Sequence, residues 1–266
     1  MSEIGERRRG ESLPDLFSGQ PGTHASSGND ATTGILVVGG VQWMTLVDFP
    51  ERVATALFTI GCNFRCPFCH NPELVDPSRY GTPLDGKEIL DRLCRRAGFV
   101  EGVVASGGEP TIQPGLIAFL LKLRQLGFLI KLDTNGSNPG TLSEILERRL
   151  VDYVAMDIKA PFDAYDRLAG ISCDVAAIEE SIALIIDAAP EYEFRTTVAP
   201  TLDRASLLRI VDHLAGAKRY ILQPFRVAGK GLLDPTWEPL AALSKAEIDA
   251  VWGEIRSSFP DGGVRG

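Results

Sequence analysis

From about residue 35 onward, short runs of apolar and β-branched residues alternate with longer segments in which apolar residues recur at helical spacing. The short runs predict buried strands, and the periodic segments predict amphipathic helices. The predicted strands are 53–60, 102–106, 128–134, 153–158, 192–198 and 219–223. The predicted helices are 86–97, 114–126, 142–150, 175–188, 205–214 and 245–257.

Side chains that can accept hydrogen bonds from a helix N-terminus stand where several of these helices begin, and they include Asp85, Asn138 or Thr141, Asp174 and Ser244. Repeated strand–helix units predict parallel strands joined by right-handed crossovers. Six such units predict an α/β fold, a partial (β/α)6 barrel of the TIM type. In that architecture functional groups gather at the carboxyl ends of the strands.

The first 33 residues differ from the rest of the chain. They are rich in Gly, Ser, Thr, Asn, Asp and charged residues and have no apolar period. Such a segment cannot bury enough surface to offset its ordering entropy, so residues 1–33 are expected to form a flexible leader and residues 34–266 the barrel domain. His24 in the leader is expected to be solvated. No secretory signal and no apolar run of eighteen residues is present, which predicts a cytoplasmic protein that does not span a membrane.

Composition narrows the choice of partners. The chain of 266 residues has 27 Lys and Arg against 35 Asp and Glu, a net charge of −8. This balance argues against a broad nucleic-acid or anionic-membrane surface, because neutralising phosphates takes clustered basic side chains. The cysteine count is 5, an odd number that does not suit a disulfide framework.

Polar clusters follow the predicted strands in order. They are GCNFRCPFCHN (61–71), SGGEP (106–110), DTNG (133–136), MDIK (156–159), FRTTV (194–198) and QPFR (223–226). Because these clusters lie at the same end of six successive parallel strands, they are expected to face one cavity.

Three of the cysteines, Cys62, Cys66 and Cys69, fall within eight residues and can converge on one metal centre. A structural zinc ion needs a fourth protein ligand, for which His70 is available, although adjacent residues seldom reach one tetrahedral ion without strain. A [4Fe–4S] cluster held by three cysteines leaves one iron open to a small molecule. The remaining two cysteines, Cys94 and Cys173, lie in or beside helical segments and are expected to be packing residues.

The spacing Cys62-x3-Cys66-x2-Cys69, with Phe68 before the last cysteine, resembles the signature of the radical S-adenosylmethionine (SAM) superfamily. This resemblance implies a [4Fe–4S] cluster and SAM as cofactors. SGGEP resembles the GGE motif of that superfamily. By this resemblance, Gly107 and Gly108 leave room for the methionine part of SAM, and Glu109 accepts hydrogen bonds from its ammonium group.

DTNG and MDIK resemble a pair of motifs in the activases of glycyl-radical enzymes. The resemblance implies that Asp133 and Thr134 line the SAM pocket. It also implies that Asp157 lies beside them, either as part of that pocket or as a ligand of a monovalent cation, and that Lys159 contacts the SAM carboxylate or ribose. Carboxylates also suit the positive sulfonium and ammonium groups of SAM.

Arg195 and His70 each have two interpretations, whereas Asn71 and His213 have one. An arginine on a buried strand is costly unless paired, so Arg195 either forms an ion pair with a pocket carboxylate or binds the SAM carboxylate. His70-Asn71 also occurs in these activases, which implies a SAM contact for Asn71, whereas His70 is as consistent with packing as with function. His213 is expected on a helix surface.

The resemblance covers about residues 35–235 and is carried by LVDFP (46–50), FTIGCNFRCPFCHNPELV (58–75), ASGGEPT (105–111), KLDTNGSNP (131–139), LVDYVAMDIKAP (150–161) and YEFRTTVAP (192–200). These segments are similar to the anaerobic ribonucleoside-triphosphate reductase activating proteins, close to the pyruvate formate-lyase activating enzymes. This chain departs from the pyruvate formate-lyase activases at Arg226, where those enzymes have a histidine.

The resemblance implies that an electron from a flavodoxin or ferredoxin cleaves SAM to a 5′-deoxyadenosyl radical, which abstracts hydrogen from a glycine of a partner enzyme, here an anaerobic ribonucleotide reductase. Three alternatives stay open. They are an activase of another glycyl-radical enzyme of the pyruvate formate-lyase type, a radical SAM enzyme that acts on a small molecule, as deazapurine carboxylate synthases do, and a non-catalytic zinc- or cluster-binding interaction module.

Overall fold

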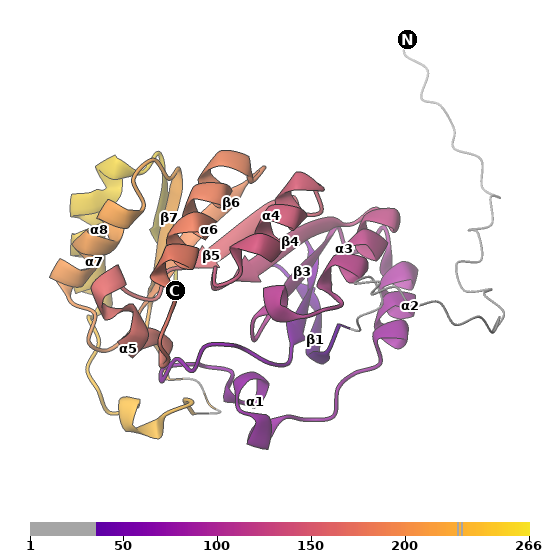
Figure 1. The fold of residues 1–266 in the computed structure, drawn as a ribbon, viewed down its shortest axis with the longest axis horizontal. Helices are drawn as coiled ribbons and strands as arrows, with labels where there is room; N and C mark the ends of the chain where they lie inside the picture. The colour runs from indigo at the N-terminus through magenta and orange to yellow at the C-terminus, as the bar shows by residue number, and fades with distance from the viewer. Residues whose placement is uncertain (1–35, 228, 230) are drawn as a thin grey trace, which may run out of the picture. The chain divides into compact units, whose positions relative to one another are not determined.

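The computed structural model describes residues 36–227, 229 and 231–266 (Figure 1). The predicted leader, residues 1–33, lies outside the described residues. Within the described part the strands form one sheet, and their bounds are β1 (Val38–Thr45), β2 (Ala54–Thr59), β3 (Gly102–Gly107), β4 (Leu129–Thr134), β5 (Tyr153–Asp157), β6 (Tyr192–Val198), β7 (Arg219–Pro224) and β8 (Asp261–Val264).

The strands follow one another in the sheet in sequence order, from β1 to β8. β1 and β2 are antiparallel, and every later neighbour is parallel. All six predicted strands are present, with ends that differ by no more than one residue. The sequence analysis missed β1 and β8, each of which contains two adjacent glycines that weaken the strand signal. The α/β fold with a parallel sheet is therefore confirmed, and the pairing pattern suits a partial barrel.

The helices connect the parallel strands. Their bounds are α1 (Pro72–Val75), α2 (Gly86–Arg96), α3 (Leu116–Gln125), α4 (Pro139–Glu147), α5 (Tyr165–Ala169), α6 (Val175–Ala188), α7 (Arg204–His213) and α8 (Lys245–Ile255), with 3-10 turns η1 (Pro77–Arg79), η2 (Pro110–Ile112), η3 (Phe162–Ala164), η4 (Pro235–Trp237) and η5 (Arg256–Ser258). In Figure 1, α3, α4 and α6 lie over one face of the curved sheet.

The predicted caps explain where several helices begin. Asp85, Asp174 and Ser244 each accept a hydrogen bond from a backbone N–H of the first turn. Of the two candidates before α4, Asn138 is the cap, and it accepts from Thr141 N at 3.3 Å. Because Pro139 suits the first helical position, α4 begins three residues before the predicted start.

The two faces of the sheet carry different side chains. The large apolar core lies between the sheet and the helices and includes Leu57, Ile130 and Phe194. Successive strand residues point to opposite faces, so their neighbours line the other, inner face. There a small apolar cluster around Phe49 and Tyr153 fills the amino-terminal half of the strands. Polar side chains occupy the carboxyl half, which is where the candidate site lies.

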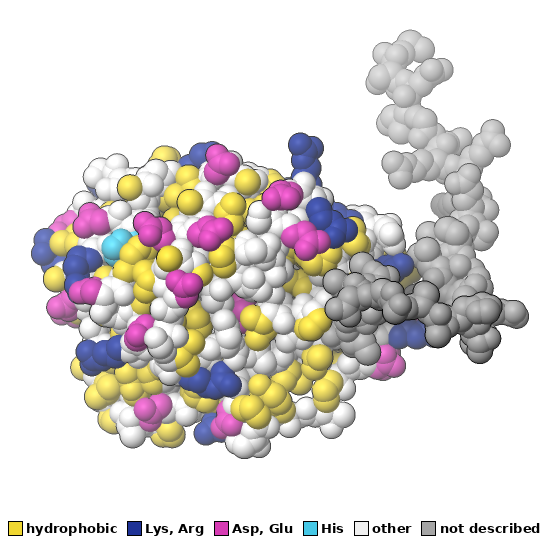
Figure 2. All heavy atoms as spheres, viewed as in Figure 1, with side chains coloured by type: hydrophobic (Ala, Val, Ile, Leu, Met, Phe, Trp, Pro, Cys, Tyr) yellow, Lys and Arg dark blue, Asp and Glu magenta, His cyan; other side chains and the backbone are white. Residues whose placement is uncertain are grey.

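No helix in the described residues has both the length and the apolar character that crossing a bilayer requires. On the face seen in Figure 2, charged side chains of both signs are interspersed over the helices.

Candidate active site

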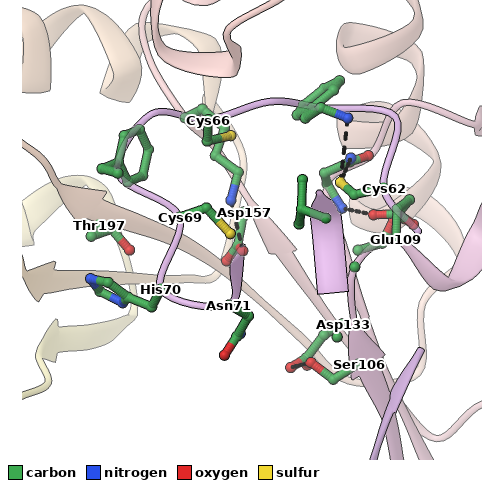
Figure 3. Close-up of a pocket in the computed structure, with 18 of the residues that line it drawn as sticks. Cys62, Cys66, Cys69, His70, Asn71, Ser106, Glu109, Asp133, Asp157 and Thr197 are labelled. Carbon is green, nitrogen blue, oxygen red and sulfur yellow. Dashed lines mark hydrogen bonds and ion pairs between the residues drawn. The ribbon is translucent and has the colours of Figure 1, made fainter. Parts of the chain in front are cut away.

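One cavity opens at the carboxyl ends of β2 to β6 (Figure 3). The residues to which the sequence analysis gave a role in the site all line it: Cys62, Cys66, Cys69, Asn71, Gly107, Gly108, Glu109, Asp133, Thr134, Asp157, Lys159 and Arg195. They come from five successive strand ends, as parallel β–α units require. The expectation that the sixth polar cluster, QPFR (223–226), faces the same cavity was wrong, because none of its residues lines it. The structure thus brings the proposed residues together, and which ligands they bind stays a prediction.

The loop that carries the three cysteines is fastened at both ends. Gly61, at φ 98°, begins the loop, and its N–H donates to Leu74 O at 2.7 Å. Arg65 N donates to Ala169 O of α5 at 2.7 Å, and the Arg65 guanidinium donates to Cys62 O at 2.6 Å. The stretch between the first two cysteines is therefore tied to α5.

A later segment covers the stretch between the second and third cysteines. Leu233 N donates to Cys69 O at 3.2 Å, and Asp234 N donates to Pro67 O at 3.0 Å. The rings of Phe68 and Trp237 lie 6.1 Å apart. These backbone hydrogen bonds hold the cysteine loop against the later segment without using the cysteine side chains.

The three thiols are protonated at neutral pH in the absence of a metal centre, although the charge of Lys159 opposes this. Burial is the main cause that raises the pKa of Cys62 to about 12 and that of Cys66 to about 11, and it also raises the pKa of Cys69. Ligation therefore requires a positively charged centre that displaces the protons. Three soft thiolates suit an iron–sulfur cluster or zinc.

His70 does not complete a four-ligand zinc set in this structure. Its imidazole stacks on Phe225 with ring centroids 5.8 Å apart, and Figure 3 shows the ring turned away from the three sulfur atoms. Among the described residues no three His, Cys, Asp or Glu side chains surround one ion-sized point. The donor set consists of three thiols around a shared cavity, which fits a [4Fe–4S] cluster with one iron left without a protein ligand.

Glu109 is almost completely buried, at 1% exposure. Its Oε1 accepts from Thr111 N at 3.0 Å, Thr111 Oγ1 at 2.5 Å and Thr134 Oγ1 at 2.8 Å, and its Oε2 accepts from Asn135 N at 2.6 Å. Burial raises the pKa of this carboxyl group above its ordinary value, although the hydrogen bonds oppose the rise. Since a carboxylate oxygen accepts about two hydrogen bonds, only Oε2 has room for one more donor.

The two glycines before Glu109 allow two backbones to meet. A Cβ atom on Gly107 would lie 2.3 Å from Thr59 N, and one on Gly108 would lie 2.0 Å from Gly61 O. Both contacts are too close for any side chain. The glycines are therefore required by the stem of the cysteine loop, whether or not they also leave room for a ligand.

Asp133 lies in the inner face of β4 among three donors. Ser106 Oγ donates to it at 3.0 Å, Lys131 forms an ion pair with it, and Arg195 Nη1 lies 3.5 Å from its Oδ2. Burial raises the pKa of Asp133, but the charges of Arg195 and Lys131 outweigh burial and hold it below its ordinary value. The group is ionised at neutral pH.

Asp157, at the end of β5, is also held by cations. Its Oδ1 accepts from Arg195 Nε at 2.8 Å, and its Oδ2 accepts from Lys159 Nζ at 3.0 Å. Burial opposes the charged form of both partners, but their mutual attraction outweighs it, so the pKa of Asp157 is lowered and the pKa of Lys159 is raised. Of the two roles considered for Arg195, the structure shows the ion pair with pocket carboxylates.

Sequence reasoning did not single out Ser106, Asn135 and Thr197, which also line the cavity. Each belongs to a polar cluster already recognised at a strand end. Thr197 lies two positions after Arg195 on β6 and so shares its face, a signal that strand alternation could have supplied. Asn135 Nδ2 donates to Asn63 Oδ1 at 3.0 Å, which links the β4 turn to the cysteine loop.

Two packing expectations can be compared with the structure. Cys94 lies on α2 and Cys173 just before α6, both away from the cavity. His213 is near the end of α7, but its ring stacks on Phe162 at 3.7 Å, and its Nε2 accepts from Phe162 N at 3.3 Å. It therefore fastens the connection that follows β5.

Comparisons with known proteins agree with this geometry. The family model described as "Radical SAM superfamily" matches residues 57–214. A protein of Methanocaldococcus jannaschii named "Putative glycyl-radical enzyme activating enzyme MJ1227" is 31% identical over 231 residues, which cover 85% of this chain and 93% of that protein. The pyruvate formate-lyase-activating enzyme of Clostridium pasteurianum is 28% identical over 200 residues, which cover 71% of this chain and 82% of that enzyme.

Among solved structures, Streptococcus suis SuiB bound to S-adenosylmethionine superposes with a TM-score of 0.61 at 13% identity, over 78% of this chain. The match covers 48% of the SuiB chain, so this chain spans about half of that protein. This likeness concerns the fold.

Proposed function

The chain belongs to the radical SAM superfamily, whose members are enzymes that use a [4Fe–4S] cluster and SAM, and from that premise we propose that it is a cytoplasmic activating enzyme that installs a glycyl radical on anaerobic ribonucleoside-triphosphate reductase. The chain is related to glycyl-radical enzyme activating enzymes. The observation that carries the activating-enzyme part of the proposal is that this relationship extends over 85% of the chain and 93% of the relative, rather than over the cysteine loop alone.

Each part of the cavity has a role in this proposal. Cys62, Cys66 and Cys69 would hold the cluster, and its iron without a protein ligand would be available to SAM. A cluster bound there would supply the electron, received from a flavodoxin or ferredoxin, for reductive cleavage of SAM to methionine and a 5′-deoxyadenosyl radical, and that radical would take hydrogen from the partner's glycine Cα. The protein residues bind, orient and shield these groups.

The charged residues suit the two ends of SAM. SAM carries a sulfonium and an ammonium group, which favour the ionised Asp133 and Asp157. Glu109 Oε2 has room for one ammonium hydrogen. Lys159 lines the same cavity and offers positive charge to the SAM carboxylate, while Arg195 holds Asp133 and Asp157 in place.

The identity of the partner is the finer part of the proposal. The segments from LVDFP to YEFRTTVAP support the anaerobic ribonucleotide reductase. The likeness to a pyruvate formate-lyase-activating enzyme supports a partner of that type to a similar degree. Arg226, which follows β7 and is exposed, stands where those activases have a histidine. A partner that differs from pyruvate formate-lyase is consistent with that exchange.

The proposal is tested by electron paramagnetic resonance. The anaerobically reconstituted protein is incubated with SAM, reduced flavodoxin and either anaerobic ribonucleotide reductase or pyruvate formate-lyase. We expect a glycyl-radical doublet with the first partner and none when Cys66→Ala replaces the wild type. A doublet with only the second partner would reassign the target, and turnover of a small substrate without any doublet would refute the activase role.

A further inference from the structure

A second buried carboxylate, Glu193, lies beneath the cavity. It precedes Arg195 by two positions on β6 and therefore faces the same side of the sheet. Its side chain has 0% exposure. It lies outside the set of residues that line the cavity. A fully buried carboxylate is costly unless it is paired and hydrogen-bonded.

Arg265 provides that pairing from a distant part of the chain. Its Nη1 donates to Glu193 Oε1 at 2.8 Å and its Nη2 donates to Oε2 at 2.7 Å, a bidentate pair. The Arg265 backbone extends the β7–β8 ladder, because its N–H donates to Leu222 O at 2.9 Å. The hydroxyl group of Tyr153 adds a third donor to Glu193 at 3.1 Å. Burial raises the pKa of Glu193, but the hydrogen bonds from Arg265 and the charge of Arg195 lower it below its ordinary value.

Arg195 connects this pair to the cavity. Its Nη1 lies 3.5 Å from Asp133 Oδ2 and 3.9 Å from Glu193 Oε1, while its Nε donates to Asp157 at 2.8 Å. Asp133, which lines the cavity, and Glu193, which does not, therefore compete for Nη1 of Arg195. With Arg265 in place, its positive charge balances that of Glu193, and the guanidinium of Arg195 stays at Asp133 and Asp157.

Removal of the Arg265 side chain would change that balance. Glu193 would lose two charge-assisted hydrogen bonds, and the nearest guanidinium left to it would be that of Arg195. A shift of the Arg195 guanidinium by about 1 Å toward Glu193 would bring Nη1 to hydrogen-bond distance of Glu193 and draw it away from Asp133. A displacement of that size is enough to weaken a binding site that depends on fixed charges.

We propose that Arg265 and Glu193 are positioning residues that hold the guanidinium of Arg195 against Asp133 and Asp157, and that they set the affinity for SAM without touching it. This inference rests on the proposed function, because it assumes that these carboxylates face SAM. Figure 3 shows Asp133 and Asp157 in the cavity together with the cysteine loop.

The test measures the SAM dissociation constant of the reconstituted protein by equilibrium dialysis, together with thermal unfolding of each variant. Arg265→Ala is expected to raise the dissociation constant about 10-fold. Asp261→Ala is the matched control, because Asp261 of β8 pairs with Arg219 at 2.5 Å and anchors the same strand, but its side chain pairs with neither Glu193 nor Arg195. Its dissociation constant is expected to stay within about 2-fold of the wild type.

The double variant Glu193→Gln with Arg265→Ala separates positioning from simple anchoring of β8. A neutral amide no longer attracts Arg195, so most of the lost affinity should return although Arg265 is still absent. If the double variant binds SAM no better than Arg265→Ala, or if Asp261→Ala loses as much affinity, the positioning role is wrong.

Arg195→Ala distinguishes a failure of the positioning role from a failure of the assignment of the cavity to SAM. If it weakens SAM binding while Arg265→Ala does not, only the positioning role fails. If Arg195→Ala leaves SAM affinity unchanged, the assignment of the cavity to SAM fails with it.

Discussion

Gly170 offers a direct test of how α5 supports the cysteine loop. This glycine ends α5 in the left-handed region, at φ 70°, and a Cβ atom there would lie 2.1 Å from the carbonyl oxygen of Arg65. Real Cβ atoms essentially never approach closer than 3.0 Å. In Gly170→Ala the cysteine loop or α5 must therefore move by at least 3.0 − 2.1 = 0.9 Å.

That displacement exceeds the tolerance of about 0.5 Å within which a functional site keeps its geometry. The loop between Cys62 and Cys66 is held to α5 by the bond from Arg65 N to Ala169 O, so the two cannot separate without losing it. The left-handed conformation costs an alanine a further ~1 kcal/mol or more. Gly170→Ala should therefore bind less than about half of the wild-type iron and sulfide after anaerobic reconstitution.

Gly127→Ala is the matched control. Gly127 has φ 81°, and a Cβ atom there would meet nothing within 4 Å. This variant should incur the same conformational cost, with Tm lower by about 2–4 °C per kcal/mol, yet bind iron normally. Equal iron and sulfide content in the two variants would refute the view that α5 positions the cluster loop.

Three further predictions concern the cavity. Cys66→Ala should lose the iron and sulfide that reconstituted protein retains, whereas Cys94→Ala, on α2, should keep them; loss of iron from Cys94→Ala would mean that the ligand set is wrong. Glu109→Gln should lower the free energy of unfolding by about 2 kcal/mol in denaturant titrations, because Thr111 N and Asn135 N bind different oxygens of Glu109 and the amide nitrogen that replaces one oxygen cannot accept a hydrogen bond. The same variant should also weaken SAM binding in equilibrium dialysis. A loss of stability with unchanged SAM affinity would mean that Glu109 stabilises the β4 turn and does not bind SAM. Gly108→Ala, whose Cβ would lie 2.0 Å from Gly61 O, should lower the iron content. Gly86→Ala, where a Cβ would meet nothing within 4 Å, should not. A normal iron content in Gly108→Ala would show that the stem of the cysteine loop can move to accommodate the added Cβ.

The pattern along the chain was sufficient for the six central strands and for the position of the site. Apolar runs flanked by polar clusters are local features, and parallel β–α units place all carboxyl ends at one edge. This is why Cys62, Glu109 and Asp157, distant in sequence, could be assigned to one cavity from the sequence alone.

The local chemistry of the site depended on contacts that the sequence does not show. The role of Gly108 depends on how close the β3 turn comes to Gly61, and the hydrogen bonds of Glu109 depend on the fold of the β4 turn. Glu193 and Arg265 are 72 residues apart, and the glycine-rich β8 that delivers Arg265 has little strand propensity. Arg195 could be recognised as paired, but the choice among its carboxylates depends on the three-dimensional arrangement of β4, β5 and β6.

The central claim is that the radical formed in this cavity takes hydrogen from a glycine Cα of a protein partner. The most direct measurement is the mass of 5′-deoxyadenosine formed with anaerobic ribonucleotide reductase in which glycine carries deuterium at Cα. We predict that the product gains one mass unit and that the gain disappears with unlabelled partner. Cleavage of SAM to unlabelled 5′-deoxyadenosine in the presence of the deuterated partner would contradict the account.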